Sequence, residues 1–238
     1  MKAGIIGAEK QEVKLLFAAL SKSGSPVRVE TRGALEFHEG ILSGCTVVVV
    51  CCGIGKVNAA LCAQMLISEF GVECVVNTGS AGGTAEGLRV LDMVVCTDAV
   101  QHDFDTTPFG YKPGQIPGTD SPFFVADSRL REIALAAYSR VIERGDAERA
   151  AAGIPGQHRM VEGRVASGDA FITSEAARER IVSLFSPACV EMEGAAIAQV
   201  CTANAIPFAV LRSISDLAGK DAGMSYDALA RVASEIRA

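Results

Sequence analysis

Carboxylates and small polar residues follow several of the apolar segments in this 238-residue chain. Five such stretches come after predicted strands, at 7–12, 79–83, 168–172, 191–194 and 212–216. Carboxyl groups can accept or donate protons, and more small and ionisable residues stand here than loop closure requires. Because ligands of α/β sheets bind at the carboxyl ends of strands, these five stretches are candidates for one shared site.

The elements that must position these residues alternate between strand and helix patterns. Strands are predicted over 2–7, 27–32, 35–42, 45–52, 73–78, 92–101, 159–168, 188–191 and 207–215, and helices over 10–21, 56–69, 128–144, 174–185, 193–204 and 225–237. We expect a hairpin at 27–42, a long ordered loop at 102–127 and a mobile surface loop at 145–158. Strands that are apolar throughout require cover on both faces. The sequence therefore predicts an α/β fold with a mostly parallel or mixed sheet and one domain over 1–238.

Charge and composition exclude several classes of partner. The net charge is −6 and no basic stripe occurs, which argues against nucleic-acid binding. No apolar run approaches the roughly 20 residues of a membrane-spanning helix, and the amino-terminal run is too short for a signal peptide. The eight cysteines form no C-x-x-C pair and are interpreted as small buried residues in a reducing compartment. We therefore expect a soluble cytoplasmic protein.

No cofactor or metal is predicted. The glycine-rich turn at 53–58 lacks the third glycine of a dinucleotide fingerprint and the Ser or Thr of a P-loop. His102, Asp103 and Asp105 lie close together in the sequence, but this run alone supplies too few ligands for a metal site. A buried, hydrogen-bonded structural role is the interpretation we favour for this run.

A family resemblance rests on eight motifs that occur in order along the chain, from residue 2 to about 235. They are Gly4–Ala8 with Glu12, Gly53–Ala60, Asn77–Gly83, Phe109–Tyr111, Gln115–Gly118, Ser167–Ile172, Val190–Ala198 and Arg212–Asp216. Together they resemble the 5′-methylthioadenosine/S-adenosylhomocysteine nucleosidases. The resemblance implies a three-layer α/β/α domain with a central mixed, partly closed sheet, of the nucleoside phosphorylase type.

The resemblance also implies a reaction, which is hydrolysis of the bond between ribose and adenine. Asp216 would be the acid that protonates purine N7, and Glu12 the base that orients and deprotonates water, as in inverting glycoside hydrolysis. Glu193 would accept hydrogen bonds from the ribose hydroxyls. The remaining substrate-binding positions implied are Ser80, Phe171, Ile172, Met192, Arg212 and Ser215. Of these, Phe171 would stack on adenine, the Ile172 backbone would read the purine edge, and Met192 would pack on ribose.

Taken one at a time, these residues allow simpler interpretations. Glu12 and Glu193 could be first-turn carboxylates that the helix dipole favours, and Asp216 could cap the next turn. Phe171 and Met192 could belong to the core. Arg212 could be a surface charge or a structural ion-pair partner, and Ser80 could only satisfy loop backbone. Their joint placement at strand ends, inside matching motifs, favours the functional interpretation.

Two positions depart from the family pattern, and three match its subunit interface. Glu9 stands where a Met is expected near the ribose, and Tyr226 stands where a Phe commonly closes over the ribose or its 5′ group. The family is dimeric, and each pocket borrows apolar residues from its neighbour. Ile54, Phe109 and Pro117 match those positions, although ordinary loop packing would also explain them. A homodimer that binds a small adenine nucleoside is therefore expected.

Three other functions remain open. A purine nucleoside phosphorylase would need Gly and Arg residues near the end of the first strand, but Glu12 stands there and no Arg occurs in 7–16. An aminodeoxyfutalosine nucleosidase would differ only in the 5′ group of its substrate. A non-catalytic nucleoside sensor would be expected to lose a carboxylate, and none is lost.

Overall fold

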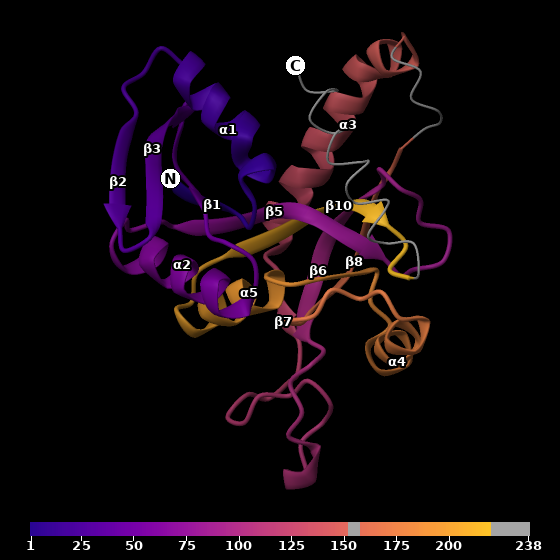
Figure 1. Cartoon of the computed structure of the whole chain (residues 1–238). Helices are drawn as coiled ribbons and strands as arrows, with labels where there is room; N and C mark the ends of the chain where they lie inside the picture. Colours follow the sequence, from indigo (N-terminus) through magenta and orange to yellow (C-terminus); the bar gives the residue numbers. More distant parts are fainter. Residues whose placement is uncertain (152–157, 220–238) are drawn as a thin grey trace.

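A mixed β-sheet runs through the molecule and carries helices on both faces (Figure 1). The computed structural model describes residues 1–151 and 158–219, with side chains for 1–140 and 158–219. Within these ranges the strands are β1 (Lys2–Gly7), β2 (Arg28–Arg32), β3 (Leu35–Leu42), β4 (Cys45–Cys51), β5 (Cys74–Gly83), β6 (Met93–Gln101), β7 (Phe124–Val125), β8 (Met160–Ser167), β9 (Cys189–Glu191) and β10 (Phe208–Asp216). The helices are α1 (Lys10–Lys22), α2 (Lys56–Ser68), α3 (Ser128–Ala151), α4 (Glu175–Phe185), α5 (Gly194–Ala203) and the 3-10 turn η1 (Thr107–Phe109).

Part of the sheet closes on itself. The strand order is β10-β6-β8-β9-β5-β1-β4-β3-β2, and β10 pairs with β5 as well as with β6. Five strands therefore form a closed ring, from which β1, β4, β3 and β2 extend as an open sheet. β5 makes this possible because its ten residues pair with β1 and then β9 along one edge, and with β10 along the other. The expectation of a mixed, partly closed sheet is confirmed.

The core lies on both faces of the sheet, as the apolar strands predicted. Val48, Val49 and Val50 of β4 are fully buried. α1 buries Val13 and Leu20, two turns apart, and α2 packs against α5 on the opposite face. Six of the eight cysteines are buried, Cys51 is half-buried, and Cys45 is exposed. The interpretation of the cysteines as buried residues is therefore wrong for Cys45.

Two predicted boundaries are wrong for identifiable reasons. Residues 79–83 were expected to form a loop, but they continue β5 because β10 and β9 pair with them. α3 runs to Ala151 although 145–151 was assigned to a mobile loop; Ala, Glu and Arg in this segment favour helix. The predicted helix at 225–237 lies outside the described residues.

The long segment between β6 and β7 is largely irregular, as expected, and contains only η1. It projects from the body at the bottom of Figure 1. No helix in the described ranges has the length and apolar character needed to cross a bilayer.

Candidate active site

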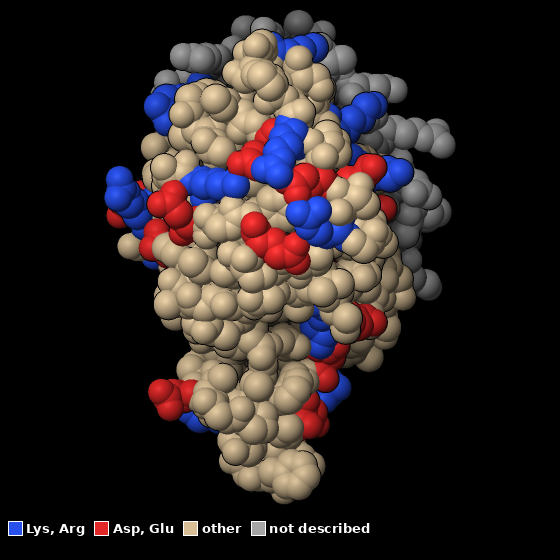
Figure 2. Space-filling model, turned by 90° about the vertical axis from the view of Figure 1, so that its left-hand side faces the viewer, with Lys and Arg blue, Asp and Glu red and all other residues tan. Residues whose placement is uncertain are grey.

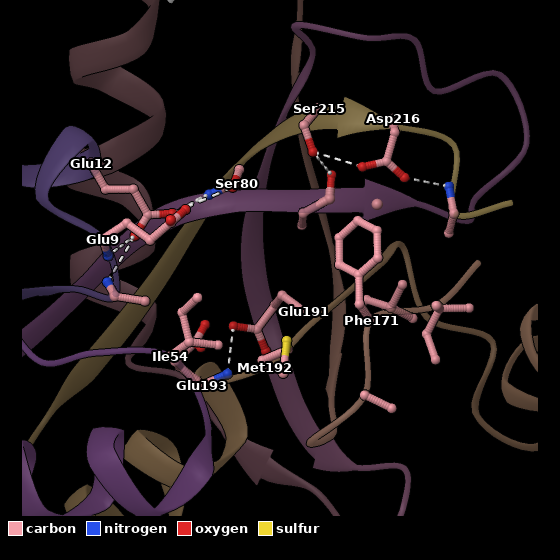
Figure 3. A pocket seen from close by; sticks show the side chains of 17 residues that line it. Glu9, Glu12, Ile54, Ser80, Phe171, Glu191, Met192, Glu193, Ser215 and Asp216 are labelled. Carbon is pink, nitrogen blue, oxygen red and sulfur yellow. Dashed lines mark hydrogen bonds between the residues drawn. The ribbon is translucent and has the colours of Figure 1, made fainter. Parts of the chain in front are cut away.

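A cavity of about 320 Å³ opens where the carboxyl ends of several strands meet (Figure 3). Each of the five stretches singled out in the sequence contributes to its wall, and the turn after β4 adds Ile54. The lining residues are Ala8, Glu9, Glu12, Ile54, Ser80, Ala81, Gly82, Ala170, Phe171, Ile172, Val190, Glu191, Met192, Glu193, Ser215, Asp216 and Ala218. Segments up to two hundred residues apart in the sequence thus share one pocket.

Glu12 is fixed at one end of the cavity by donors from two directions. It lies in the first turn of α1, where its Oε2 accepts the backbone N–H of Ala8 at 2.7 Å and of Glu9 at 3.1 Å. Its Oε1 accepts the backbone N–H of Ser80 at 3.0 Å and faces Ser80 Oγ at 3.4 Å. Helix capping explains the first pair of contacts, but the contacts across to β5 go beyond what a capping carboxylate needs.

Asp216 stands at the other end, and it is buried. Ser215 Oγ donates to its Oδ2 at 2.8 Å, and the backbone N–H of Ala218 donates to its Oδ1 at 2.8 Å. The pairing of β10 with β5 shifts register between Ile214 and Asp216. Such a bulge re-aims a side chain at the end of a strand. Asp216 therefore caps the following turn, as the simpler interpretation held, and also faces the cavity.

The floor of the cavity rests on a buried ion pair between Arg212 and Glu191. A structural ion pair was one interpretation of Arg212 from the sequence, but its partner Glu191 had been given no role. Arg212 of β10 is only 1% exposed, and its guanidinium contacts Glu191 through both Nη2 and Nε, the latter at 3.1 Å. Glu191 also accepts the backbone N–H of Glu193 at 3.1 Å and of Gly194 at 2.8 Å. Glu191 thus takes the helix-capping role at α5 that had been considered for Glu193. The sequence offered one sign of this pair, namely that the Glu191–Glu193 run contains two carboxylates.

Glu193 turns away from its own helix. Its Oε1 accepts the backbone N–H of Gly55 at 2.8 Å, and its Oε2 lies 3.8 Å from Arg212 Nη2. Burial and the neighbouring Glu191 raise the pKa of Glu193 to about 7. Burial alone would also raise the pKa of Glu191, but Arg212 and the hydrogen bonds outweigh it and lower that pKa. Arg212 therefore pairs closely with Glu191 and lies farther from Glu193, and the pKa values of the two carboxylates shift in opposite directions.

Another part of the cavity wall is apolar. Phe171 stands beside Asp216 in Figure 3, with Met192 and Glu193 between it and the Glu9–Glu12 end. Ile172 and Ile54 complete the wall. An aromatic ring at the cavity wall offers a stacking surface for a flat heterocycle.

Some predicted site residues lie elsewhere. Phe109 and Pro117 are on the projecting segment, with Phe109 81% exposed, and neither lines the cavity. Arg212 lies behind the cavity wall and acts through Glu191 and Glu193. Tyr226 lies outside the described residues.

Comparison with known proteins places this site in a family. A model of the phosphorylase superfamily matches residues 2–238. The chain is 42% identical to the 5′-methylthioadenosine/S-adenosylhomocysteine nucleosidase of Treponema pallidum over 235 residues, which cover 95% of this chain and 86% of the relative. It is 39% identical to the nucleosidase of Halalkalibacterium halodurans, with 98% and 93% covered. The chain belongs to the 5′-methylthioadenosine/S-adenosylhomocysteine nucleosidase family.

Solved structures of this nucleosidase family share the fold. The Neisseria meningitidis nucleosidase in complex with methylthio-immucillin-A aligns with a TM-score of 0.83 at 37% identity, covering 99% of this chain and 94% of that one. The Colwellia psychrerythraea nucleosidase in complex with adenine gives 0.84 at 38% identity, with 100% and 93% covered. A futalosine hydrolase of Helicobacter pylori is also similar, at 0.83 and 33% identity, with 100% and 94% covered.

Glu9, which departs from the nucleosidase pattern, lies on the cavity wall beside Glu12 (Figure 3). Gln11 Nε2 donates to its carboxylate at 3.1 Å. Burial raises the pKa of Glu9; the bond from Gln11 opposes this shift, and the Glu12 carboxylate adds to it. The chain therefore carries a second carboxyl group beside Glu12 at this end of the cavity.

Replacing Arg212 by Met should strongly destabilise the fold. The change leaves the Glu191 carboxylate buried without its cation, which costs about 3–5 kcal/mol in comparable cases. Urea unfolding measures the loss. Arg32→Met is the matched control: Arg32 is itself exposed and pairs with the half-buried Glu30 and the exposed Glu69, so the change should cost less than about 1 kcal/mol. Adding Glu191→Gln to Arg212→Met should recover part of the loss. Equal losses of stability in Arg212→Met and Arg32→Met would contradict the assignment.

Glu193 should give the fold a pH dependence of defined sign. Because its folded pKa, about 7, lies above the unfolded value, the folded state binds the proton more tightly. Its contribution to stability is therefore complete below about pH 4.5 and is lost as the pH rises to 7. Relative to wild type, Glu193→Gln should gain on the order of 1–3 kcal/mol between pH 5 and pH 8 in urea unfolding. The exposed Glu36→Gln variant should show the same dependence of unfolding free energy on pH as wild type. The same dependence in Glu193→Gln would refute the prediction.

Proposed function

We propose that this protein hydrolyses the N-glycosidic bond of 5′-substituted adenine nucleosides, such as methylthioadenosine and S-adenosylhomocysteine. The products are adenine and the 5′-substituted ribose. The observation that carries the proposal is one cavity with Glu12 at one end, Asp216 at the other, and Glu193 on the floor between them. The names of the relatives, and the complex of a 38% identical nucleosidase with adenine, support the choice of substrate.

Asp216 acts on the leaving group. When the bond between C1′ and N9 breaks, its electrons pass to the purine, and a proton placed on N7 makes adenine a better leaving group. Ser215 Oγ lies 2.8 Å from Asp216 and 3.3 Å from the Ala81 carbonyl oxygen. A hydroxyl has one proton, so when Ser215 donates it to Ala81, its oxygen can accept the proton of a protonated Asp216. The serine therefore accommodates the aspartate in both protonation states.

Glu12 acts on the nucleophile. Backbone donors from Ala8, Glu9 and Ser80 fix both carboxylate oxygens, and the fourth contact, from Ser80 Oγ to Oε1, is long at 3.4 Å. A water that replaces this weak contact would be oriented against C1′. As the water oxygen bonds to C1′, its proton passes to Glu12. Two carboxyl groups on opposite sides of the sugar are the arrangement of inverting glycoside hydrolysis, here with a nitrogen leaving group.

Glu193 serves the sugar, and the apolar wall serves the purine. The Glu193 carboxylate accepts the ribose hydroxyls and favours the positive charge that develops on the ring as the bond breaks. Phe171 stacks on adenine, the backbone of Ile172 reads its edge, and Met192 packs on the ribose.

The charge of the cavity favours water over phosphate as the nucleophile. Among the described residues that line it, neither lysine nor arginine occurs, whereas five carry carboxyl groups: Glu9, Glu12, Glu191, Glu193 and Asp216. An anionic nucleophile would be repelled there. A phosphorylase is therefore disfavoured. An aminodeoxyfutalosine nucleosidase is the second candidate, because a futalosine hydrolase shares the fold at 33% identity.

Adenine release in phosphate-free buffer tests the reaction. Wild type should turn over a panel of methylthioadenosine, S-adenosylhomocysteine, 5′-deoxyadenosine and aminodeoxyfutalosine, and the order of rates ranks their 5′ groups. Asp216→Asn and Glu12→Gln should each lose at least about 100-fold in kcat while remaining folded in circular dichroism, since each removes a proton-transfer group. Glu36→Gln, on the exposed side of β3, is the control. Phosphate-dependent turnover would reject hydrolysis, and wild-type rates in Asp216→Asn would remove Asp216 from the mechanism.

We also propose a homodimer whose interface borders the cavity. Exposed apolar side chains gather at the start of α2 and on the projecting segment, at Ile54, Val57, Leu61 and Phe109. Figure 2 shows charged side chains mostly on the upper part of the molecule, with an uncharged central area below them and further charged side chains at both sides of the lower part. Ile54 lines the cavity as well, so a partner seated here would complete it. Phe109 and Pro117 are then available to the partner's pocket.

Light scattering at micromolar concentration tests the dimer. Wild type should show twice the mass of the chain, and Leu61→Asp should lower that mass because it places a carboxylate in an apolar contact. Val29→Asp, at a similarly exposed position on β2, should remain dimeric. A monomeric mass for wild type would exclude the proposal.

A cytoplasmic location is proposed on the basis of the cysteines. All eight are free thiols in the structure. Burial raises the pKa of Cys52 to about 12, which favours the protonated thiol. Thiols of this kind are typical of proteins kept in a reducing compartment.

A further inference from the structure

A closed ring of three contacts joins Lys56, Asp103 and Asp169 just outside the cavity. Lys56 Nζ lies 2.6 Å from Asp103 Oδ1. The backbone N–H of Asp169 donates to Asp103 Oδ2 at 2.9 Å, and the backbone N–H of Lys56 donates to Asp169 Oδ1 at 2.8 Å. Each residue therefore contacts both of the others. None of the three lines the cavity.

The ring ties together three segments that are far apart in the sequence. Lys56 is the first residue of α2, Asp103 follows β6, and Asp169 follows β8. Asp169 directly precedes residues 170–172, which form the apolar wall of the cavity. On the other side of the ring, Gly55 donates its backbone N–H to Glu193. The backbone amides of Gly55 and Lys56, at the start of α2, thus bind Glu193 and Asp169. Glu193 is the carboxylate proposed to bind the sugar, and Asp169 precedes the segment proposed to bind the purine.

The surroundings of the ring favour a fixed geometry. Gln101 Oε1 accepts a second bond from Lys56 Nζ at 3.0 Å, and the side chains of Lys56 and Asp103 are only 16% and 32% exposed. Burial opposes charge on Asp103, yet the bonds from Lys56 and Asp169 lower its pKa. The positive end of the α2 dipole also favours carboxylates at this point.

Close packing holds the same segments together. A Cβ on Gly168 would lie 2.4 Å from the ring of His102, and one on Gly55 would lie 3.2 Å from Asp169 Oδ1. Gly55 has a φ of +99°, which favours glycine in any case. His102 and Asp103, singled out in the sequence, thus lie where the segments that follow β6 and β8 pack against each other.

We propose that Lys56, Asp103 and Asp169 are positioning residues that hold the 170–172 segment in place to receive the purine. The assignment of the ligand rests on the proposed function. Glu12 accepts hydrogen bonds from Ala8, Glu9 and Ser80, and Asp216 accepts them from Ser215 and Ala218. None of these donors belongs to the Lys56–Asp103–Asp169 ring. Loss of the ring should therefore weaken purine binding while leaving the bond-breaking step largely unchanged.

Calorimetric titration with adenine, together with steady-state kinetics, tests the proposal. Lys56→Met should weaken adenine binding about tenfold and raise KM by a similar factor, with kcat within about threefold of wild type. Lys56→Arg keeps the charge and should restore most of the affinity. Lys2→Met is the matched control, because Lys2 pairs with Glu39 at 2.7 Å with side chains 24% and 23% exposed, at the opposite end of β1. It should bind adenine as wild type does.

The outcomes separate this proposal from the proposed function. Adenine affinity within twofold of wild type in Lys56→Met would overturn the positioning role. A fall in melting temperature and kcat with unchanged KM would also overturn it, because that pattern indicates a purely structural pair. If wild type binds adenine but releases none from any nucleoside, the proposed function fails and the titration still decides the role of the ring. If wild type binds no adenine, the assignment of the ring to purine binding falls as well.

Discussion

The buried guanidinium of Arg212 is the contact on which the site depends. Transfer of a charge into the interior is unfavourable unless partners compensate it, and here Glu191, Asn77 and Glu193 surround one cation. Glu191 in turn accepts the first amides of α5 and the hydroxyl of Ser167. The strands β5, β8, β9 and β10 thereby meet around one ion pair. The ion pair that joins these strands of the closed sheet consequently also supports the floor of the cavity.

This arrangement leaves the cavity with an excess of negative charge. Arg212 is committed to Glu191 behind the wall, so Glu9, Glu12, Glu193 and Asp216 face the ligand with no basic residue in the described lining. Such a field disfavours anions and favours a centre that becomes positive during the reaction. A sugar losing a purine is a centre of this kind. The electrostatics of the cavity therefore agree with the proposed chemistry.

Much of the fold and site could be predicted because local patterns specify them. The apolar runs at 2–7 and 45–52 gave the central strands to within one residue, and placing polar residues at strand ends brought Glu12 and Asp216 into one cavity. Long-range pairing could not be predicted in this way. The glycines at 79–83 read locally as a loop, and only pairing with β9 and β10 makes them strand. Similarly, Glu191 and Glu193 are equivalent by type and spacing, and only the position of Arg212 distinguishes them.

Gly79 shows how little sequence freedom such a site leaves. A Cβ at this position would lie 2.7 Å from Glu12 Oε1 and 2.8 Å from Arg212 Nη1, so both groups approach because no side chain stands between them. A side chain at residue 79 would therefore have to displace the Glu12 carboxylate or the Arg212 guanidinium. Position 9 is only half-buried and lies at the rim of the same pocket. A change at such a rim position alters what the ligand meets without displacing the groups that pack around Gly79.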